Sequence, residues 1–218
     1  MKTVVFDLDG TLLDSAPDII DSLEYALAKA GIILNRPIPV AVVGPPVREM
    51  IDRLGIVITK DQELQVIDAF RKHYDPSPML LTRPYWGAQT LLAELQKRGW
   101  SIFFATNKPC FPTARLIERF FSGFVDDFCC VDTIPDKKLS KREMLEILTY
   151  KHSLKSQNSI MIGDRSADIR AGREIGWRTI AVGWGYGAES KLRLEEPTWW
   201  ARSMENILEC LERYNNHG

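Results

Sequence analysis

Asp7-Leu8-Asp9-Gly10-Thr11 directly follows the apolar run Val4-Val5-Phe6. A short β-branched and aromatic run that ends in Asp and Gly is typical of a buried strand that breaks into a turn. Asp7 then projects from the carboxyl end of the strand, where open α/β sheets bind ligands. Alternate strand residues face opposite sides, so Asp7 and Asp9 can serve one site only if the backbone turns after Asp7, which Gly10 favours. A polar exit from a strand, without a catalytic role, also explains this stretch when it is taken alone.

The composition indicates a folded protein that acts on a small molecule. The 218 residues are 45% hydrophobic, which is enough for a proper core. The formal net charge is −1, and lysines and arginines are scattered, so nothing suggests binding to nucleic acid or to a membrane surface. No apolar run approaches the roughly 20 residues that span a bilayer, and we expect a cytoplasmic protein.

The four cysteines give no sign of a disulfide framework or of a metal motif. Cys110, Cys129, Cys130 and Cys210 show neither a Cys-x-x-Cys pair nor a metal-binding spacing with histidine. Cys129 and Cys130 are adjacent inside an apolar, strand-like run. We therefore interpret all four as reduced thiols.

The pattern of predicted elements changes along the chain. Helical periodicity, interrupted by prolines, dominates up to about residue 98, and from there strands alternate with helices. Such alternation is typical of a parallel sheet with helices on both faces. We predict an α/β fold, a doubly wound parallel sheet formed by residues 1–14 and 86–218, with residues 15–85 inserted as an all-helical cap. The predicted helices are 18–30, 47–54, 61–74, 88–98, 113–121, 141–150 and 167–175, and the predicted strands after the first are 102–105, 128–131, 160–162 and 179–182.

Polar residues follow two further predicted strands. Thr106-Asn107-Lys108 ends the strand 102–105, where a hydroxyl and nearby amides can hold a phosphate oxygen, although helix capping also explains Thr and Asn. Gly163-Asp164-Arg165-Ser166-Ala167-Asp168 ends the strand 160–162. Asp164 suits a metal ligand, and Asp168 lies one helical turn later and can orient it, whereas a helix start explains either residue alone.

A lysine cluster lies between a predicted strand and a helix. Lys137, Lys138 and Lys141 fall in this segment. One of them can neutralise an anionic substrate, although lysines in loops are usually solvated surface residues.

Together these clusters resemble the four motifs of the haloacid dehalogenase superfamily. The matching residues are Asp7 to Thr11, Thr106, a lysine and Gly163 to Asp168. An Asp two residues after the nucleophile resembles the pattern of the phosphatases and phosphomutases of the superfamily. Asp9 therefore favours phosphoryl transfer. Four further stretches resemble phosphoglycolate phosphatases and their close relatives: Asp14-Ser15-Ala16-Pro17-Asp18, Val43-Gly44-Pro45-Pro46, Thr106-Asn107-Lys108-Pro109 and Gly183-Trp184-Gly185-Tyr186-Gly187.

The resemblance implies Mg²⁺-dependent hydrolysis of a small, phosphoglycolate-like phosphate monoester through an aspartyl phosphate on Asp7. Asp9 is expected to act first as acid and then as base, and Thr106 and a lysine to contact the phosphate. We choose Lys141 because Lys-Arg-Glu-Met-Leu resembles the family's lysine that opens a helix. Lys137 and Lys138 stay open, because the usual Gly-Lys-Pro context is absent.

The resemblance also implies a metal site and a substrate site. Mg²⁺ is expected on Asp7, Asp164 and the backbone carbonyl of Asp9, supported by Asp168, and the presence of only three histidines argues against zinc. If the substrate carries a second anion, we expect Arg48 to contact it, with a surface arginine as the alternative. The predicted contacts of the phosphate or substrate are Gly10, Thr106, Asn107, Lys108 and Arg48.

Three other functions remain open. A sugar phosphomutase of the same superfamily uses the same Asp pair and helical cap, and a broad phosphatase for sugar phosphates, nucleotides or pyrophosphate fits the same motifs. A non-catalytic binding module is disfavoured because every acid of the motifs is present. Closure of the cap on hinges at residues 14–16 and 81–85 would favour a small-molecule substrate over a protein or a nucleic acid.

Overall fold

The computed structural model describes residues 2–216 and divides the chain into two units. Unit 1 consists of Met1–Leu13 and Pro84–Gly218, and unit 2 consists of Asp14–Arg83. The chain passes between the units at two short strands, β2 (Leu13–Asp14) and β3 (Arg83–Pro84), which form a separate two-stranded sheet. These boundaries lie within one or two residues of the boundaries predicted at 14/15 and 85/86.

Unit 1 is built on a six-stranded parallel sheet with the order β5-β4-β1-β6-β7-β8. The first strand of the chain lies inside the sheet, and the chain builds strands first on one side of it and then on the other. The order of the strands therefore reverses beside β1, which is where doubly wound sheets bind ligands. The predicted fold class is confirmed. The strands are β1 (Lys2–Phe6), β4 (Trp100–Thr106), β5 (Asp127–Cys130), β6 (Ser159–Gly163), β7 (Arg178–Val182) and β8 (Trp199–Ala201).

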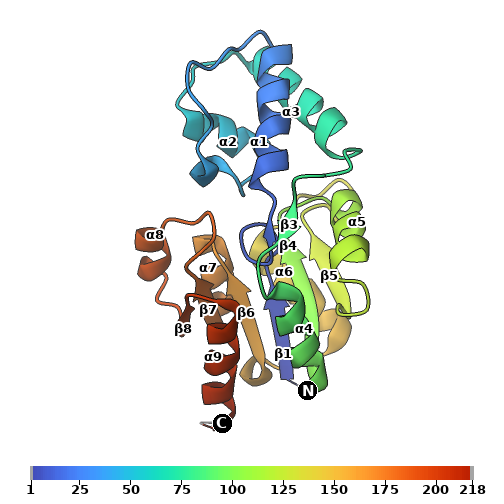
Figure 1. Ribbon diagram of the computed structural model, residues 1–218, viewed down its shortest axis with the longest axis vertical. Helices are drawn as coiled ribbons and strands as arrows, with labels where there is room; N and C mark the ends of the chain where they lie inside the picture. Colours follow the sequence, from blue (N-terminus) through green and yellow to red (C-terminus); the bar gives the residue numbers. More distant parts are fainter. Residues whose placement is uncertain (1, 217–218) are drawn as a thin grey trace. The chain divides into compact units, whose positions relative to one another are not determined.

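Helices cover both faces of this sheet (Figure 1). One face carries α6 (Lys141–His152) and α7 (Ser166–Glu174), which pack against each other, and the other carries α4 (Ala88–Lys97) and α9 (Met204–Asn216). Val4-Val5-Phe6 is fully buried at all three positions because both faces are covered, which explains an apolar run without alternation. Within residues 2–216, no helix combines the length and the apolar character needed to cross a bilayer.

The largest differences between the structure and the predicted elements lie in two places. Helix α5 (Cys110–Phe120) begins before the predicted start at residue 113. Pro112 is tolerated because it falls in the first turn, where a backbone N–H would have no intrahelical partner. Residues 189–216 contain α8 (Glu189–Leu194), β8 and α9, for which the sequence patterns predicted no element. The half-buried Trp199 and Trp200 belong to the edge strand β8.

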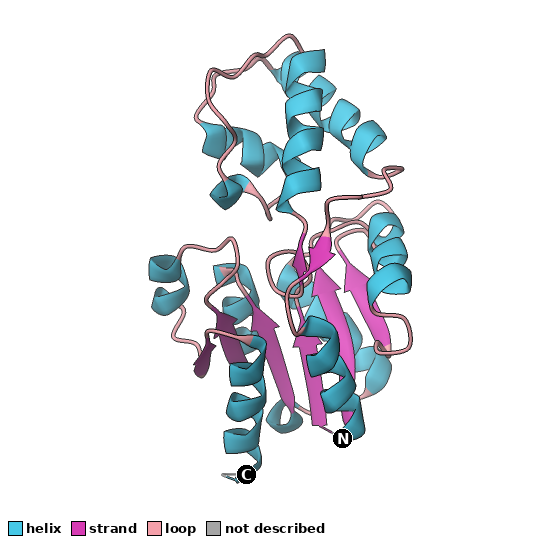
Figure 2. Cartoon of the chain, viewed as in Figure 1, coloured by secondary structure: helices cyan, strands magenta, loops and turns pink. Residues whose placement is uncertain are grey.

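Unit 2 consists of helices between β2 and β3, a stretch that the structure describes throughout (Figure 2). Its main elements are α1 (Ala16–Lys29), α2 (Val47–Leu54) and α3 (Lys60–Tyr74), and α3 packs against the other two. Asp18 is buried in the first turn of α1 and accepts hydrogen bonds from the backbone amides of Leu81 (3.1 Å) and Thr82 (2.5 Å). This carboxylate ties the end of unit 2 to its first helix.

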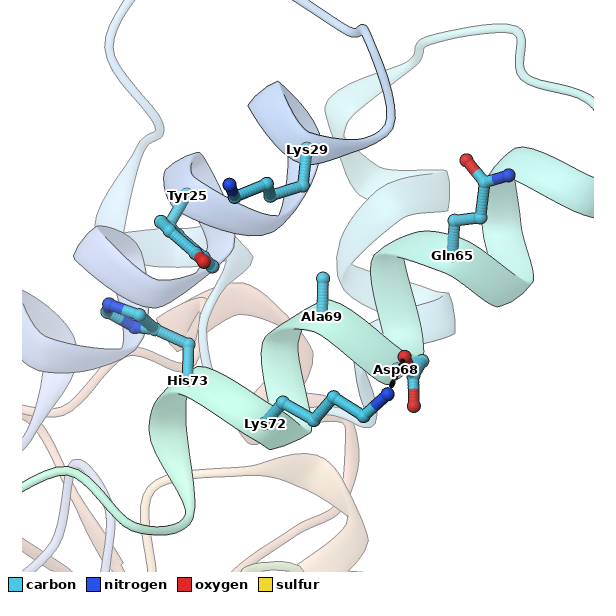
Figure 3. Close-up of a pocket in the computed structure, with 7 residues that line it drawn as sticks. All are labelled: Tyr25, Lys29, Gln65, Asp68, Ala69, Lys72 and His73. Carbon is cyan, nitrogen blue, oxygen red and sulfur yellow. Dashed lines mark ion pairs between the residues drawn. The ribbon is translucent and has the colours of Figure 1, made fainter.

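A shallow hollow of about 340 Å³ lies between α1 and α3 on the surface of unit 2 (Figure 3). The ring of Tyr25 stacks on that of His73 at a centroid distance of 4.2 Å, and His73 Nδ1 lies 3.0 Å from Ser22 Oγ. Lys72 Nζ pairs with Asp68 Oδ2 at 2.8 Å. The stack and the hydrogen bond join α1 to α3.

Candidate active site

The polar residues singled out from the sequence converge at the carboxyl edge of the sheet around β1. Asp7 directly follows β1, Thr106 ends β4, and Asp164 directly follows β6. The Asp7 amide donates to the Ile162 carbonyl at 2.8 Å, so sheet pairing extends up to Asp7 itself. Three parallel strands therefore bring residues that are far apart in the sequence to one edge.

Lys141 connects the carboxylates of this edge. Its Nζ lies 2.7 Å from Asp7 Oδ1 and 2.9 Å from Asp168 Oδ1, and it donates to the Ala105 carbonyl at 2.6 Å. The side chain is 4% exposed. Lys141 is the first residue of α6, and a capping box of Ser140 and Glu143 fixes that end of the helix.

The other two lysines of the cluster lie elsewhere. Lys137 Nζ pairs with Glu143 Oε1 at 2.7 Å and its side chain is 51% exposed, and Lys138 is exposed. Of the three candidates, the structure brings Lys141 to Asp7.

Three buried carboxylates form an acidic cluster. One carboxylate oxygen from each of Asp7, Asp164 and Asp168 lies within 4.8 Å of the others. Burial and the neighbouring carboxylates raise the pKa of Asp7 to about 8, although Lys141 opposes the shift, and burial with Asp168 raises the pKa of Asp164 to about 6. Arg165 Nε lies 3.6 Å from Asp164 Oδ2, so the three carboxylates outnumber the two cations, Lys141 and Arg165, that pair with them. An all-oxygen site of this kind fits Mg²⁺, which prefers carboxylate and carbonyl ligands.

The segment Gly183–Gly187, which the sequence analysis quoted only for its family resemblance, binds Asp164. Thr11 Oγ1 donates to its Oδ1 at 3.2 Å, and the amides of Tyr186 and Gly187 donate to its Oδ2 at 2.8 and 3.2 Å. A Cβ at Gly185 would lie 2.2 Å from the Asp164 Cβ. The signal in the sequence is the alternation of glycines directly after a strand, which lets a backbone approach a buried carboxylate.

Gly10 makes room at the same carboxylate. Its φ is +86°, and a Cβ here would lie 2.6 Å from Asp164 Oδ2. The Gly10 amide donates to the Leu13 carbonyl at 2.8 Å, inside the turn. Gly10 therefore serves the site through the turn and through its missing side chain.

Asp9 forms an ion pair with a second buried lysine, Lys108. Lys108 Nζ lies 3.1 Å from Asp9 Oδ2, and the two side chains are 2% and 12% exposed. The Lys108 amide donates to Thr106 Oγ1 at 3.2 Å, and Asn107 between them is half-buried. The turn after β4 thus places a second cation against the second carboxylate of the Asp7-Leu8-Asp9 stretch.

Arg48 belongs to unit 2. It lies in the first turn of α2, its side chain is 65% exposed, and its Nε lies 3.4 Å from Glu63 Oε1. Its contact with a substrate stays a prediction.

This fold and site define a class of α/β enzymes that carry an Asp-x-Asp turn after the first strand of a doubly wound sheet, with a lysine and further acids beside it. Residues 4–182 match the family model of haloacid dehalogenase-like hydrolases, and the chain belongs to this family. It is therefore a hydrolase-family enzyme.

Individual relatives share the family over most of the chain. The chain is 32% identical over 217 residues to a phosphoglycolate phosphatase of Aquifex aeolicus, covering 98% of each protein. It is 33% identical over 193 residues to a Mycobacterium tuberculosis protein named tyrosine-protein kinase PtkA, covering 85% of this chain and 63% of that one. A crystal structure described as a predicted phosphatase from Clostridium acetobutylicum is 26% identical, with a TM-score of 0.86 and coverage of 97% and 98%.

We expect Mg²⁺ to stabilise the folded protein more at about pH 8 than at about pH 6. With the pKa of Asp7 near 8 and that of Asp164 near 6, the metal-free folded state holds protons that the unfolded state has lost, so its stability falls as the pH rises through this range. A cation on the ionised carboxylates offsets this loss. Thermal unfolding in Mg²⁺ and in chelator at both pH values measures the gap in Tm.

The difference in Tm between Mg²⁺ and chelator is expected to increase as the pH rises and to disappear in Asp164→Asn. A gap that stays constant or narrows as the pH rises would contradict a cation site on these carboxylates.

Proposed function

We propose that this enzyme hydrolyses a small phosphate monoester, similar to phosphoglycolate, with Mg²⁺ and through an aspartyl phosphate on Asp7. The observation that carries the proposal is the pair of carboxylates Asp7 and Asp9, each held by a separate buried lysine at the edge of the sheet. The similarity over nearly the whole chain to proteins named phosphoglycolate phosphatase supports the substrate class.

Asp7 performs the first step. Lys141 binds its Oδ1, and we assign the attack on phosphorus to Oδ2. As the new O–P bond forms, the bond from phosphorus to the alkoxide oxygen breaks, and Asp9 donates a proton to the leaving alkoxide. The products are an alcohol and a phosphate ester of Asp7.

In the second step Asp9 acts as a base, the reverse of its role in the first step. Its carboxylate takes a proton from the water that attacks the phosphorus, and inorganic phosphate leaves with Asp7 restored. Lys108, at 3.1 Å, positions Asp9 for both transfers. Thr106 and Asn107, in the turn that carries Lys108, are the residues we assign to the phosphate oxygens.

Charge repulsion is the obstacle to the first step. A carboxylate and a phosphate oxygen at about 4 Å repel by roughly 4 kcal/mol per charge pair at an effective dielectric constant near 20. Lys141 offsets part of this repulsion. Asp7, Asp164 and the backbone carbonyl of Asp9 would hold Mg²⁺, with Asp168 behind them, and the bound ion supplies further positive charge to the phosphoryl oxygens.

The proposal has consequences for partners and location. A small phosphate ester is the only partner that the chemistry requires, without nucleic acid or membrane. On the composition of the chain, we also propose that the enzyme works in the cytoplasm.

Phosphate release from a substrate panel tests this function. The panel contains phosphoglycolate, sugar phosphates, nucleoside monophosphates and pyrophosphate, each assayed with Mg²⁺ and with chelator. We expect Mg²⁺-dependent selectivity for phosphoglycolate, and a loss of at least about a thousandfold in Asp7→Asn, because the nucleophile is removed. An unchanged circular dichroism spectrum shows that the variant is folded.

Each other outcome has a definite meaning. Full activity in Asp7→Asn excludes Asp7 as the nucleophile. Equal turnover of all esters supports a broad phosphatase, and conversion between sugar phosphates that requires a bisphosphate primer supports a phosphomutase.

Replacement of the lysines tests the choice among them. We expect Lys141→Met to lower kcat by about a hundredfold or more, because it removes the cation bound to Asp7 and Asp168. Lys137→Met is the matched control, since this lysine pairs with Glu143, and its kcat is expected to stay within about twofold of wild type. Equal losses of kcat in both variants would contradict the assignment of Lys141 as the cation that binds Asp7 during catalysis.

Steady-state kinetics of Arg48→Ala test the predicted contact with a second anion. We expect KM to rise by about tenfold or more for phosphoglycolate, whose carboxylate is a second anionic group. KM is expected to change little for phenyl phosphate, which has no anionic group besides its phosphate. Arg53→Ala on the same helix removes an equal charge and serves as the control. Equal changes in KM for both esters, or in both variants, would exclude the contact.

A further inference from the structure

Two cysteines that are twenty positions apart in the sequence meet in unit 1. Cys110 opens α5 and Cys130 ends β5, and their sulfur atoms and a carboxylate oxygen of Asp132 all lie within 4.8 Å of one another. Cys130 rather than Cys129 takes part, because neighbouring strand residues point to opposite faces and Cys129 packs in the core with Met144. The fold thus creates a cluster with no counterpart in the spacing of the sequence.

Hydrogen bonds already orient the three groups. The Cys110 amide donates to Asp132 Oδ1 at 2.7 Å, and the Cys130 amide donates to Thr133 Oγ1 at 2.7 Å. Thr133 Oγ1 also lies 3.5 Å from Cys110 Sγ. Because this oxygen accepts from an amide, its own proton can be directed to the sulfur. Such outer contacts orient the ligands of metal sites.

A second hydroxyl lies beside the other sulfur. Thr113 is fully buried, and its Oγ1 is one of four side-chain atoms within residues 2–216 that are buried without a hydrogen-bond partner. It is close enough to Cys130 to lower the pKa of that thiol, which burial raises. A buried hydroxyl without an acceptor costs free energy, and the Cys130 sulfur is a nearby atom that can accept a hydrogen bond from it. The Thr113 hydroxyl is therefore placed to donate a hydrogen bond to the Cys130 sulfur.

We propose that Cys110, Cys130 and Asp132 bind a divalent cation of the zinc class. Zinc binds thiolate sulfur at about 2.3 Å and carboxylate oxygen at about 2.0–2.2 Å in a tetrahedron, in which neighbouring ligand atoms are roughly 3.5 Å apart. The present spacing of the three atoms, within 4.8 Å of one another, is close to that geometry. Asp132 is exposed, so the ion has a path from solvent and water can take the fourth position.

The ligands distinguish this site from the acidic cluster around Asp7. Thiolates select soft cations such as zinc, whereas the all-oxygen cluster suits Mg²⁺. Because thiolates are the metal-binding form of cysteine, the incoming ion displaces thiol protons. Cys110 lies two residues after Lys108, so an ion bound here would tie the turn that carries Thr106 and Lys108 to the segment after β5.

Titration with Co²⁺ tests the site independently of any activity. The full-length protein, reduced and kept in excess Mg²⁺, is titrated with Co²⁺ and followed by absorption spectroscopy. Thiolate ligands produce a sulfur-to-cobalt charge-transfer band in the near ultraviolet, whereas the oxygen ligands of the acidic cluster do not. We expect the band to saturate near one equivalent and to disappear when Zn²⁺ is added.

Single substitutions identify the ligands. Cys110→Ala and Cys130→Ala are expected to lose the band, whereas Cys210→Ala, which removes a buried thiol in α9, retains it. Asp132→Asn is expected to weaken Zn²⁺ binding by at least about tenfold, because even outer partners of metal ligands contribute that much. Cys110 and Asp132 are less buried than Cys130, so their variants carry the test if Cys130→Ala does not fold.

Three results would overturn the proposal. They are the absence of the band in the reduced wild-type protein, a band that survives in Cys110→Ala, and a band that is lost in Cys210→Ala. Circular dichroism of each variant checks that the fold is retained.

Discussion

The concentration of buried negative charge after β1 and β6 is the constraint on which the rest of unit 1 depends. Three carboxylates within 4.8 Å of one another repel in a region that water does not screen. Lys141 pairs with both Asp7 and Asp168 but carries only one positive charge. Asp164 pairs with Arg165 and accepts hydrogen bonds from the Thr11 hydroxyl and two backbone amides. The three carboxylates outnumber these two cations, and our proposal of a Mg²⁺ site at this edge rests on that charge balance.

Meeting that constraint requires backbone to approach closely from another part of the chain. The segment Gly183–Gly187 follows β7 and lies against Asp164, where a Cβ at Gly187 would lie 1.8 Å from the Asp164 carbonyl oxygen. The same segment anchors the first turn, because Trp184 Nε1 donates to the Thr11 carbonyl at 3.1 Å. The geometry of the Asp7-Leu8-Asp9 turn therefore depends on a loop about 175 residues later in the chain.

The turn after β4 connects the two clusters at which we propose metal ions. Its buried Lys108 faces the oxygen-rich edge through Asp9, and four residues after Thr106 the chain reaches Cys110 and the sulfur-rich cluster of β5. A parallel sheet makes this possible, because adjacent strands end at the same edge and their following turns are neighbours. Hard and soft ligands can then lie near one another without sharing an ion.

The sequence by itself determined the fold class. Alternating strands and helices predict a parallel sheet, because both periodicities are local properties of the chain, and the proline-punctuated helices mark the insertion. It also indicated which polar residues lie at strand ends. The patterns did not predict β8 and α9, because short edge strands and amphipathic terminal helices carry weak periodicity.

Only the tertiary structure decided the contacts. Lys137, Lys138 and Lys141 lie within five positions, and the sequence favoured Lys141 only through a family resemblance. Of these three, the capped start of α6 brings Lys141 to Asp7. Cys110 and Cys130 show no metal spacing, yet the pairing of β4 with β5 brings them together. Local periodicity encodes elements, whereas distances between distant side chains depend on strand order and register, which form only when the whole sheet packs.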